Sequence, residues 1–188
     1  RQAEITYNTD RPIKIVYAGN IGDGQGLDYI IPQMALAGQE SLEFLIVGDG
    51  SRKSKLETEI KKFDLRNVEL TAPVSRSELL KIYNKADVLF LHLNMFDAFN
   101  KVLPSKIFEY AATGKPILAG VEGFPRRFIL DKIRNAKVFT PGNLSESSEA
   151  LSKLKREDTN REEFVDEFSR QKIMKKMARS IYTEYQKK

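Results

Sequence analysis

Residues 104–116 read Pro-Ser-Lys-Ile-Phe-Glu-Tyr-Ala-Ala-Thr-Gly-Lys-Pro, and this stretch decides the fold around it. The Pro-Ser step predicts the end of a loop and the cap of a helix about two turns long, which Gly114 stops before an apolar strand at Pro116–Ala119. In such a helix, beside a sheet, Glu109 can accept hydrogen bonds from a sugar diol. The free N–H groups of the helix and Lys106 can meet phosphate at the same time. The arrangement suits a nucleotide-sugar.

Around this stretch, short apolar runs alternate with helical patterns. Strands are predicted at Ile13–Ala18, Leu42–Val47, Val68–Leu70, Val88–Leu93, Pro116–Ala119 and Lys137–Phe139. Helices are predicted at Leu27–Ala37, Arg52–Phe63, Ser77–Asn84, Ser105–Thr113, Pro125–Arg134, Ser145–Leu154 and Arg161–Gln186. This alternation is typical of a doubly wound α/β domain, a Rossmann-like parallel sheet of about six strands with right-handed crossovers. Ligands of such a sheet bind beyond the carboxyl ends of its strands, where the motifs below fall.

The chain divides at the charged, weakly apolar stretch Lys155–Asn160. We predict a nucleotide-sugar-binding domain over residues 1–154 and a helical extension over residues 155–188. Because a strand follows closely on Arg1, we expect an excised domain whose N-terminal partner domain is absent. The long final helix carries an apolar stripe with the spacing of one face, which favours a packing surface over a ligand site: Phe164, Phe168, Met174, Met177, Ile181 and Tyr185.

The composition is that of a soluble globular protein of 188 residues, 41% hydrophobic and 30% charged. The absence of cysteine excludes disulfides and thiolate metal sites and favours a reducing compartment, the cytoplasm. No apolar run approaches the roughly 20 residues of a membrane span. The net charge of +5 lies mainly in the tail, since residues 1–150 hold 20 basic and 19 acidic side chains and residues 151–188 hold 11 and 7. We therefore expect no nucleic-acid partner, whereas peripheral contact of the tail with the inner face of a membrane stays open beside a solvated helix face.

The first predicted strand runs into Gly19-Asn20-Ile21-Gly22-Asp23-Gly24-Gln25-Gly26, with four glycines in eight residues. Glycines let a backbone pass close to a phosphate and direct N–H groups toward it. The spacing is not the dinucleotide fingerprint, because no glycine falls three residues after Gly24. Asp23 is an unfavourable neighbour for a pyrophosphate, so a flexible turn remains the alternative.

Other chemistries have weak support. His92, the single histidine, ends a buried strand, which favours a core histidine with satisfied hydrogen bonds. No Asp-x-Asp pair exists to hold a divalent ion, and Ser105 has no histidine base in sequence range for a hydrolytic triad. Glu109 has an alternative interpretation as an exposed helix acid paired with Lys115 or Lys106.

Together these motifs resemble the C-terminal half of GT-B glycosyltransferases of family 4, also called group 1. The resemblance is carried by the Gly-x-x-Gly turn, by Ile-Val-Gly-Asp-Gly at 46–50, by Tyr-x-x-Ala-Asp-Val-Leu at 83–89 and most specifically by residues 104–117. It covers about residues 13–154 and is closest to bacterial transferases of surface-polysaccharide assembly that handle amino or deoxy sugars. The family implies a retaining transferase whose C-terminal domain holds the nucleotide-sugar and whose N-terminal domain holds the acceptor.

The resemblance also implies roles for single residues. Glu109 matches the second acid of the family's Glu-x7-Glu motif, which binds the ribose hydroxyls, while the first acid falls at Lys101, a departure. We expect the backbone of residues 100–103, which includes Leu103, to make that contact instead. The positions of the basic residues in the family's first loop are held here by Asn20 and Gln25, which are uncharged. We expect Lys106, aided by the helix N-terminus at Ser105, to replace that charge. Gly19 and Gly22 belong to the glycine loop expected at the phosphates, and Val74 resembles the position whose backbone meets the nucleobase.

We therefore expect a domain that holds an NDP-sugar, with UDP as the favoured nucleotide, for transfer to a saccharide or lipid-linked acceptor in polysaccharide assembly. The partners implied are the donor and the missing N-terminal domain; no metal or other cofactor is expected, and no catalytic residue is assigned. The fragment alone should bind nucleotide weakly and transfer nothing. The alternatives are a GT-B sugar-nucleotide epimerase, which needs catalytic carboxylates and a histidine, and a non-catalytic nucleotide-binding or scaffold module.

Overall fold

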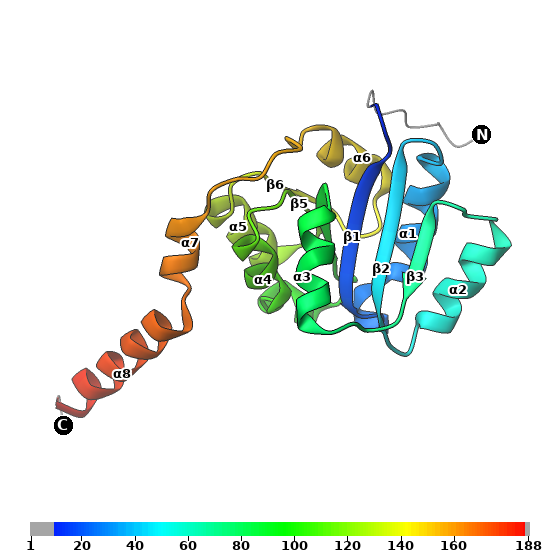
Figure 1. Cartoon of the computed structure of the whole chain (residues 1–188). Helices are drawn as coiled ribbons and strands as arrows, with labels where there is room; N and C mark the ends of the chain where they lie inside the picture. The colour runs from blue at the N-terminus through cyan, green and yellow to red at the C-terminus, as the bar shows by residue number, and fades with distance from the viewer. Residues whose placement is uncertain (1–9, 187–188) are drawn as a thin grey trace.

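The computed structural model describes residues 10–186, built around one parallel sheet (Figure 1). Its six strands follow the order β3-β2-β1-β4-β5-β6. They are β1 (Ile13–Asn20), β2 (Leu42–Asp49), β3 (Val68–Thr71), β4 (Val88–His92), β5 (Ile117–Gly120) and β6 (Ala136–Phe139). Every neighbouring pair is parallel. The doubly wound α/β fold predicted from the sequence is confirmed, while the expected start at Arg1 lies outside the described residues.

Helices cover both faces of the sheet (Figure 1). On one face lie α1 (Leu27–Ala37), α2 (Lys53–Lys62) and α6 (Leu144–Ser152), and on the other lie α3 (Arg76–Lys85), α4 (Lys106–Ala112), α5 (Gly123–Lys132) and α7 (Glu162–Glu167). Short 3-10 turns, η1 (Asp23–Gln25) and η2 (Asp97–Lys101), follow β1 and β4, and α8 (Arg170–Gln186) ends the chain. All five residues of β4 are buried, as a strand covered on both faces requires.

The sheet opens between its two central strands. β1 pairs with β2 along its whole length, but it pairs with β4 only at Ile15–Val88 and Val16–Leu89. Strand order reverses at this position, because β2 and β3 lie to one side of β1 and β4 to β6 lie to the other. Crevices at such switch points are where doubly wound sheets bind ligands.

The prediction of one long helix at Arg161–Gln186 is wrong, because the chain breaks between α7 and α8. Phe164 and Phe168 pack against Phe108 and Phe128, and this packing turns α7 onto the domain. Ser169 then starts a new helix, since its hydroxyl accepts the N–H of Lys172 at 3.3 Å.

The predicted apolar stripe is therefore divided between the two helices. Phe164 is buried, whereas Met174, Met177, Ile181 and Tyr185 are exposed on α8, which points away from the sheet (Figure 1). No described helix is long and apolar enough to span a membrane.

The stretch between α6 and α7 is held against the domain. The side chain of Asn135 donates to the carbonyls of Lys155 and Glu157 and accepts the N–H of Lys155. Further along, the N–H of Thr159 donates to Gly114 at 2.9 Å. This stretch and α7 thus pack against the end of α4 and against α5, while the predicted division at residue 154 stays a prediction.

Candidate functional site

A pocket of about 430 Å³ opens at the carboxyl ends of β1 and β2. Its wall also includes the loop after β3 and residues from α3 and α4. Among the residues predicted for the site, five meet here: Gly19, Asn20, Val74, Lys106 and Glu109. The remaining wall consists of Ala18, Val47, Gly48, Asp49, Pro73, Leu79 and Tyr83. Lys106 and Glu109 share this hollow because they lie three residues apart, on one face of α4.

The opening between β1 and β4 is closed by side chains of α4. At Ala18, beyond the last pair with β4, the backbone N–H donates to the hydroxyl of Tyr110 at 3.0 Å. The carbonyl of Ala18 accepts a hydrogen bond from Lys106 Nζ. Both backbone groups are satisfied without a neighbouring strand, as buried polar groups require.

The Lys106 ammonium is held in a partly buried position at the floor of the pocket. It lies 5.4 Å from the ring centroids of both Tyr17 and Tyr110, within the range of cation–π attraction. Burial lowers the pKa of Lys106, and the nearby charge of Glu109 opposes this effect. Gly19 has a left-handed φ of +145°, and a Cβ there would lie 2.4 Å from Lys106 Nζ, so any side chain at this position would displace the ammonium.

Glu109 is exposed at the pocket and forms one side-chain hydrogen bond within residues 10–186, accepting from the hydroxyl of Tyr83 at 3.4 Å. Lys115, a partner considered in the alternative interpretation, instead pairs with Asp158 at 3.0 Å. No ion pair in this part of the chain joins Glu109 to a lysine. Its carboxylate is available to a ligand.

The glycine loop is closed on itself by Gln25. The Gln25 Oε1 accepts the N–H of Gly22 at 3.1 Å and the side-chain amide of Asn20 at 3.0 Å. Asp23, expected to disfavour a pyrophosphate, is paired with Arg52 at 2.5 Å. Gly22 and Gln25 lie outside the pocket wall and shape the loop that carries Asn20.

Three other predicted residues also lie outside the pocket wall. Ser105 precedes α4, but its side chain makes no capping hydrogen bond, so the expectation that it caps the helix is corrected. Ser105 has helical backbone angles and its carbonyl accepts the N–H of Glu109 at 3.3 Å. Lys101 is exposed at the end of η2, and Leu103 packs on the core beside the sheet.

His92 is the satisfied core residue that its place in a buried strand predicts. Its Nδ1 lies 2.6 Å from the carbonyl of Gln25, and its Nε2 accepts the N–H of Gly142 at 3.1 Å. Because a carbonyl only accepts, Nδ1 carries the proton and the ring is neutral. Burial lowers the pKa of His92 to about 4. Through its two hydrogen bonds, the ring connects the glycine loop to the turn before α6.

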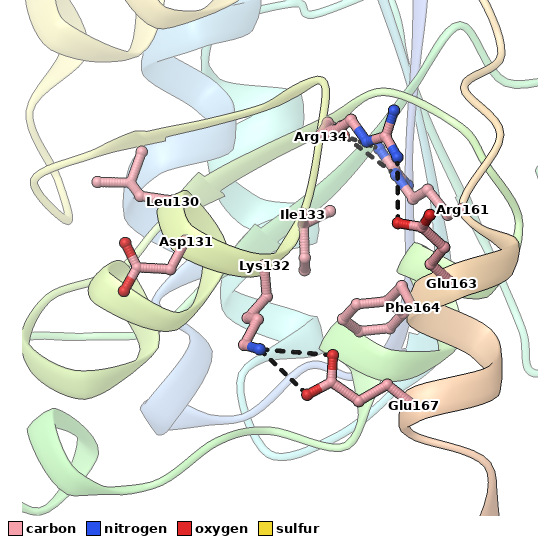
Figure 2. Close-up of a pocket in the computed structure, with 9 residues that line it drawn as sticks. All are labelled: Leu130, Asp131, Lys132, Ile133, Arg134, Arg161, Glu163, Phe164 and Glu167. Carbon is pink, nitrogen blue, oxygen red and sulfur yellow. Dashed lines mark hydrogen bonds and ion pairs between the residues drawn. The ribbon is translucent and has the colours of Figure 1, made fainter.

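A second cavity, of about 290 Å³, lies between α5 and α7 (Figure 2). The buried Arg161 donates there to the carbonyls of Arg134, Asn135 and Ala111. Ion pairs of Lys132 with Glu167 and of Arg134 with Glu163 join α5 to α7 across this cavity (Figure 2). Because these four charges are paired with one another and Arg161 is bound by carbonyls, we interpret the cavity as part of the packing contact between α7 and the domain.

Residues 2–171 match the family model of the glycosyl transferases group 1. The chain belongs to this family. The resemblance drawn from the sequence is thereby confirmed. Among curated proteins, the chain is 33% identical over 110 residues to Escherichia coli K12 WcaI, whose name describes a glycosyl transferase of colanic acid biosynthesis. This match covers 58% of the chain and 27% of WcaI.

Solved structures of glycosyltransferases share the fold of this group 1 chain. The lipopolysaccharide outer core galactosyltransferase WaaB matches with a TM-score of 0.70 and 16% identity, over 98% of the chain and 53% of WaaB. An S. aureus TarM variant, solved with fondaparinux, alpha-GlcNAc-glycerol and UDP, matches with a TM-score of 0.67 and 18% identity, over 94% of the chain and 37% of TarM. The chain thus spans about half or less of these proteins.

Sequence reasoning missed three tyrosines at the candidate site. Tyr17 donates to the carbonyl of Asn20 at 2.6 Å, Tyr83 donates to Glu109, and Tyr110 accepts from Ala18. Only the motif that begins at Tyr83 was noticed, as a supporting signal of the resemblance. Each of the three belongs to a different element, so no local spacing connects them.

Proposed function

We propose that this chain is the donor-binding domain of a retaining glycosyltransferase that transfers a sugar from an NDP-sugar, with UDP favoured, to a saccharide or lipid-linked acceptor in polysaccharide assembly. The observation that carries the proposal is the shared pocket of Lys106 and Glu109 at the switch point of the sheet. Membership of the group 1 family and the fold shared with a UDP-bound neighbour support it.

Lys106 is assigned to the diphosphate. When the bond between the sugar and the diphosphate breaks, negative charge develops on the leaving oxygen, and a fixed ammonium in a partly dry site stabilises it without reorganisation. The Ala18 carbonyl and two tyrosine rings fix that ammonium before any ligand arrives. Because Lys106 would neutralise the diphosphate, we expect that binding of the nucleotide-sugar requires no metal ion.

Glu109 is assigned to the ribose hydroxyls, and the backbone at Val74, across the pocket, is assigned to the base. A carboxylate can accept hydrogen bonds from both hydroxyls of a ribose while it keeps the bond from Tyr83, because its two oxygens offer about four lone-pair sites. Together with Lys106, these assignments give each of the three parts of a nucleoside diphosphate a contact within the same pocket.

The epimerase alternative is disfavoured by the surroundings of His92. Both ring nitrogens are occupied by backbone groups and the ring is buried, so it has no free nitrogen to exchange a proton with a sugar. The scaffold alternative predicts no saturable nucleotide binding and is separated by titration.

The test is calorimetric titration of the chain with UDP, GDP and NAD. Saturable binding of UDP, weaker binding of GDP and no transfer of sugar by the fragment alone are the expected results. Selective binding of NAD would overturn the nucleotide-sugar assignment. Absence of all nucleotide binding would favour the scaffold alternative.

The exposed apolar side of α8 supports the prediction of a partner domain. Since the chain spans about half of WaaB, we propose that this side, with Met174, Met177 and Ile181, packs on the rest of the full-length protein. An anionic membrane is the competing partner, because Lys172, Lys175, Lys176 and Arg179 lie on the same helix. Cosedimentation with phosphatidylglycerol vesicles but not with phosphatidylcholine vesicles would favour the membrane; the cytoplasmic location stays a prediction.

A further inference from the structure

Tyr83 is a completely buried residue that lines the candidate site and bonds to Glu109 through its hydroxyl. The side chain rises from α3 with 0% exposure and meets Tyr110 of α4 edge to face, at 5.5 Å between centroids and 83° between planes. Packing on all sides leaves the ring no alternative orientation, because interiors are close-packed and hold side chains in single rotamers. The hydroxyl therefore occupies a fixed point beside the pocket, 3.4 Å from Glu109 Oε1.

Glu109 by contrast is an exposed side chain with three rotatable bonds. Within the described part of the chain, the Tyr83 hydroxyl is the one group that donates a hydrogen bond to it. A free glutamate must lose rotamer entropy when it binds a ligand, at a cost of about 0.5–1.5 kcal/mol for a mobile side chain. A donor at a fixed point removes part of this cost, since it favours the rotamer that faces the pocket before the ligand arrives.

We propose that Tyr83 is a positioning residue that holds Glu109 toward the ribose and so sets the preference of the site for ribonucleotides over deoxynucleotides. The inference rests on the proposed function, because it takes Glu109 as the group that binds the ribose. Tyr83 touches no ligand itself in this arrangement. Its effect should appear only with ligands that carry the hydroxyls read by Glu109.

The test compares UDP with 2′,3′-dideoxy-UDP by calorimetry in the 188-residue chain and in Tyr83→Phe. Loss of the Tyr83 hydroxyl should weaken the binding of UDP by about 2- to 12-fold, which is the entropy cost of one side chain expressed as a ratio of affinities. The affinity for the dideoxy nucleotide should stay unchanged. Tyr110→Phe is the matched control, since it removes a buried tyrosine hydroxyl that accepts the Ala18 N–H, whereas in residues 10–186 the hydroxyl that bonds to Glu109 is that of Tyr83. In this control, the affinity for UDP divided by the affinity for dideoxy-UDP should equal that of the parent. A fraction of unfolded protein lowers the apparent affinities for both nucleotides alike, so it does not change this ratio.

A double-mutant cycle with Glu109→Ala separates the inference from the proposed function. If Glu109→Ala leaves the ratio unchanged, the ribose contact and the role of Tyr83 both fail. If Glu109→Ala lowers the ratio but Tyr83→Phe does not, only the positioning role fails. The inference requires that Tyr83→Phe has no further effect once Glu109 is removed; an equal loss in both backgrounds would show that Tyr83 acts independently of Glu109.

Discussion

The buried His92 predicts a steep loss of stability in mild acid. Its neutral ring donates from Nδ1 to Gln25 and accepts at Nε2 from Gly142. Protonation would put a hydrogen on Nε2, facing the Gly142 N–H, so that two donors would oppose each other. It would also place a charge at a residue that is only 1% exposed. The folded state therefore resists protonation, and burial lowers the pKa to about 4 although the Gln25 carbonyl opposes this.

The size of the effect follows from the two pKa values. The unfolded chain binds the proton with the usual pKa of 6.5 and the folded chain with a pKa of about 4, which corresponds to roughly 3 kcal/mol. Because the folded pKa is the lower one, the full stability is present above about pH 6.5. Stability is lost as the pH falls toward 4 and the unfolded state takes up the proton. Against a typical stability of about 5–15 kcal/mol, this is a large fraction.

The assay is urea unfolding followed by circular dichroism between pH 7.5 and 4, in the parent and in His92→Asn. We expect the parent to lose about 1.4 kcal/mol per pH unit near pH 5, in addition to any loss that both proteins share. Burial would raise the pKa of Asp87, but hydrogen bonds from Arg11 and from the Lys14 N–H outweigh it and lower that pKa, and hydrogen bonds from Thr140 lower the pKa of Glu146. Both carboxylates therefore destabilise the two proteins alike at lower pH and cancel in the difference. Parallel pH profiles for the two proteins would refute the reasoning.

Three further substitutions test the site and its support. Glu109→Ala should weaken UDP binding by about 1.5–3 kcal/mol, the value of a hydrogen bond to a charged group, and an unchanged affinity in calorimetry would make Glu109 a surface acid. Lys106→Ala should weaken UDP far more than uridine, and equal losses for both ligands would remove Lys106 from the phosphate site. Arg161→Met should lower the free energy of unfolding by about 1–3 kcal/mol, measured in urea, because the Arg134 carbonyl loses both of the hydrogen bonds that Arg161 donates to it, and an unfolding curve like that of the parent would contradict these contacts.

The sequence predicted those parts of the fold that depend on local signals. The helix at Leu27–Ala37 has the predicted bounds, and the helix predicted at Ser77–Asn84 is present as α3, whose start is fixed by hydrogen bonds that Ser75 and Glu78 exchange between side chains and backbone. Both features are encoded within a few residues. The break before α8 was missed because the apolar spacing continues through Ser169, whereas the packing of Phe168 on α4 and α5 that bends the chain joins residues far apart in sequence.

The position of the candidate site could be predicted from the sequence, but the contacts that hold its side chains in place could not. Lys106 and Glu109 could be placed together because three residues in a helix define one face and because strand order places that helix at a carboxyl edge. The state of each side chain depends on partners from other elements, namely Tyr83 from α3 and Ala18 from β1. These partners lie far apart in the sequence, so no periodic pattern of residues predicts them.

The divergence of β1 from β4 connects the fold to the chemistry proposed for the site. Beyond Val16, one edge of β1 has no strand to pair with, so the N–H and carbonyl of Ala18 need other partners. A tyrosine hydroxyl and an ammonium from α4 meet that need. The ammonium has further N–H groups beyond the one given to Ala18, and it lies at the floor of the pocket, where the proposal places the diphosphate. The loop residues Asn20 and Gln25 carry no charge and cannot neutralise a diphosphate. In this proposal Lys106 does so, and it is the same ammonium that satisfies the Ala18 carbonyl at the unpaired edge of β1.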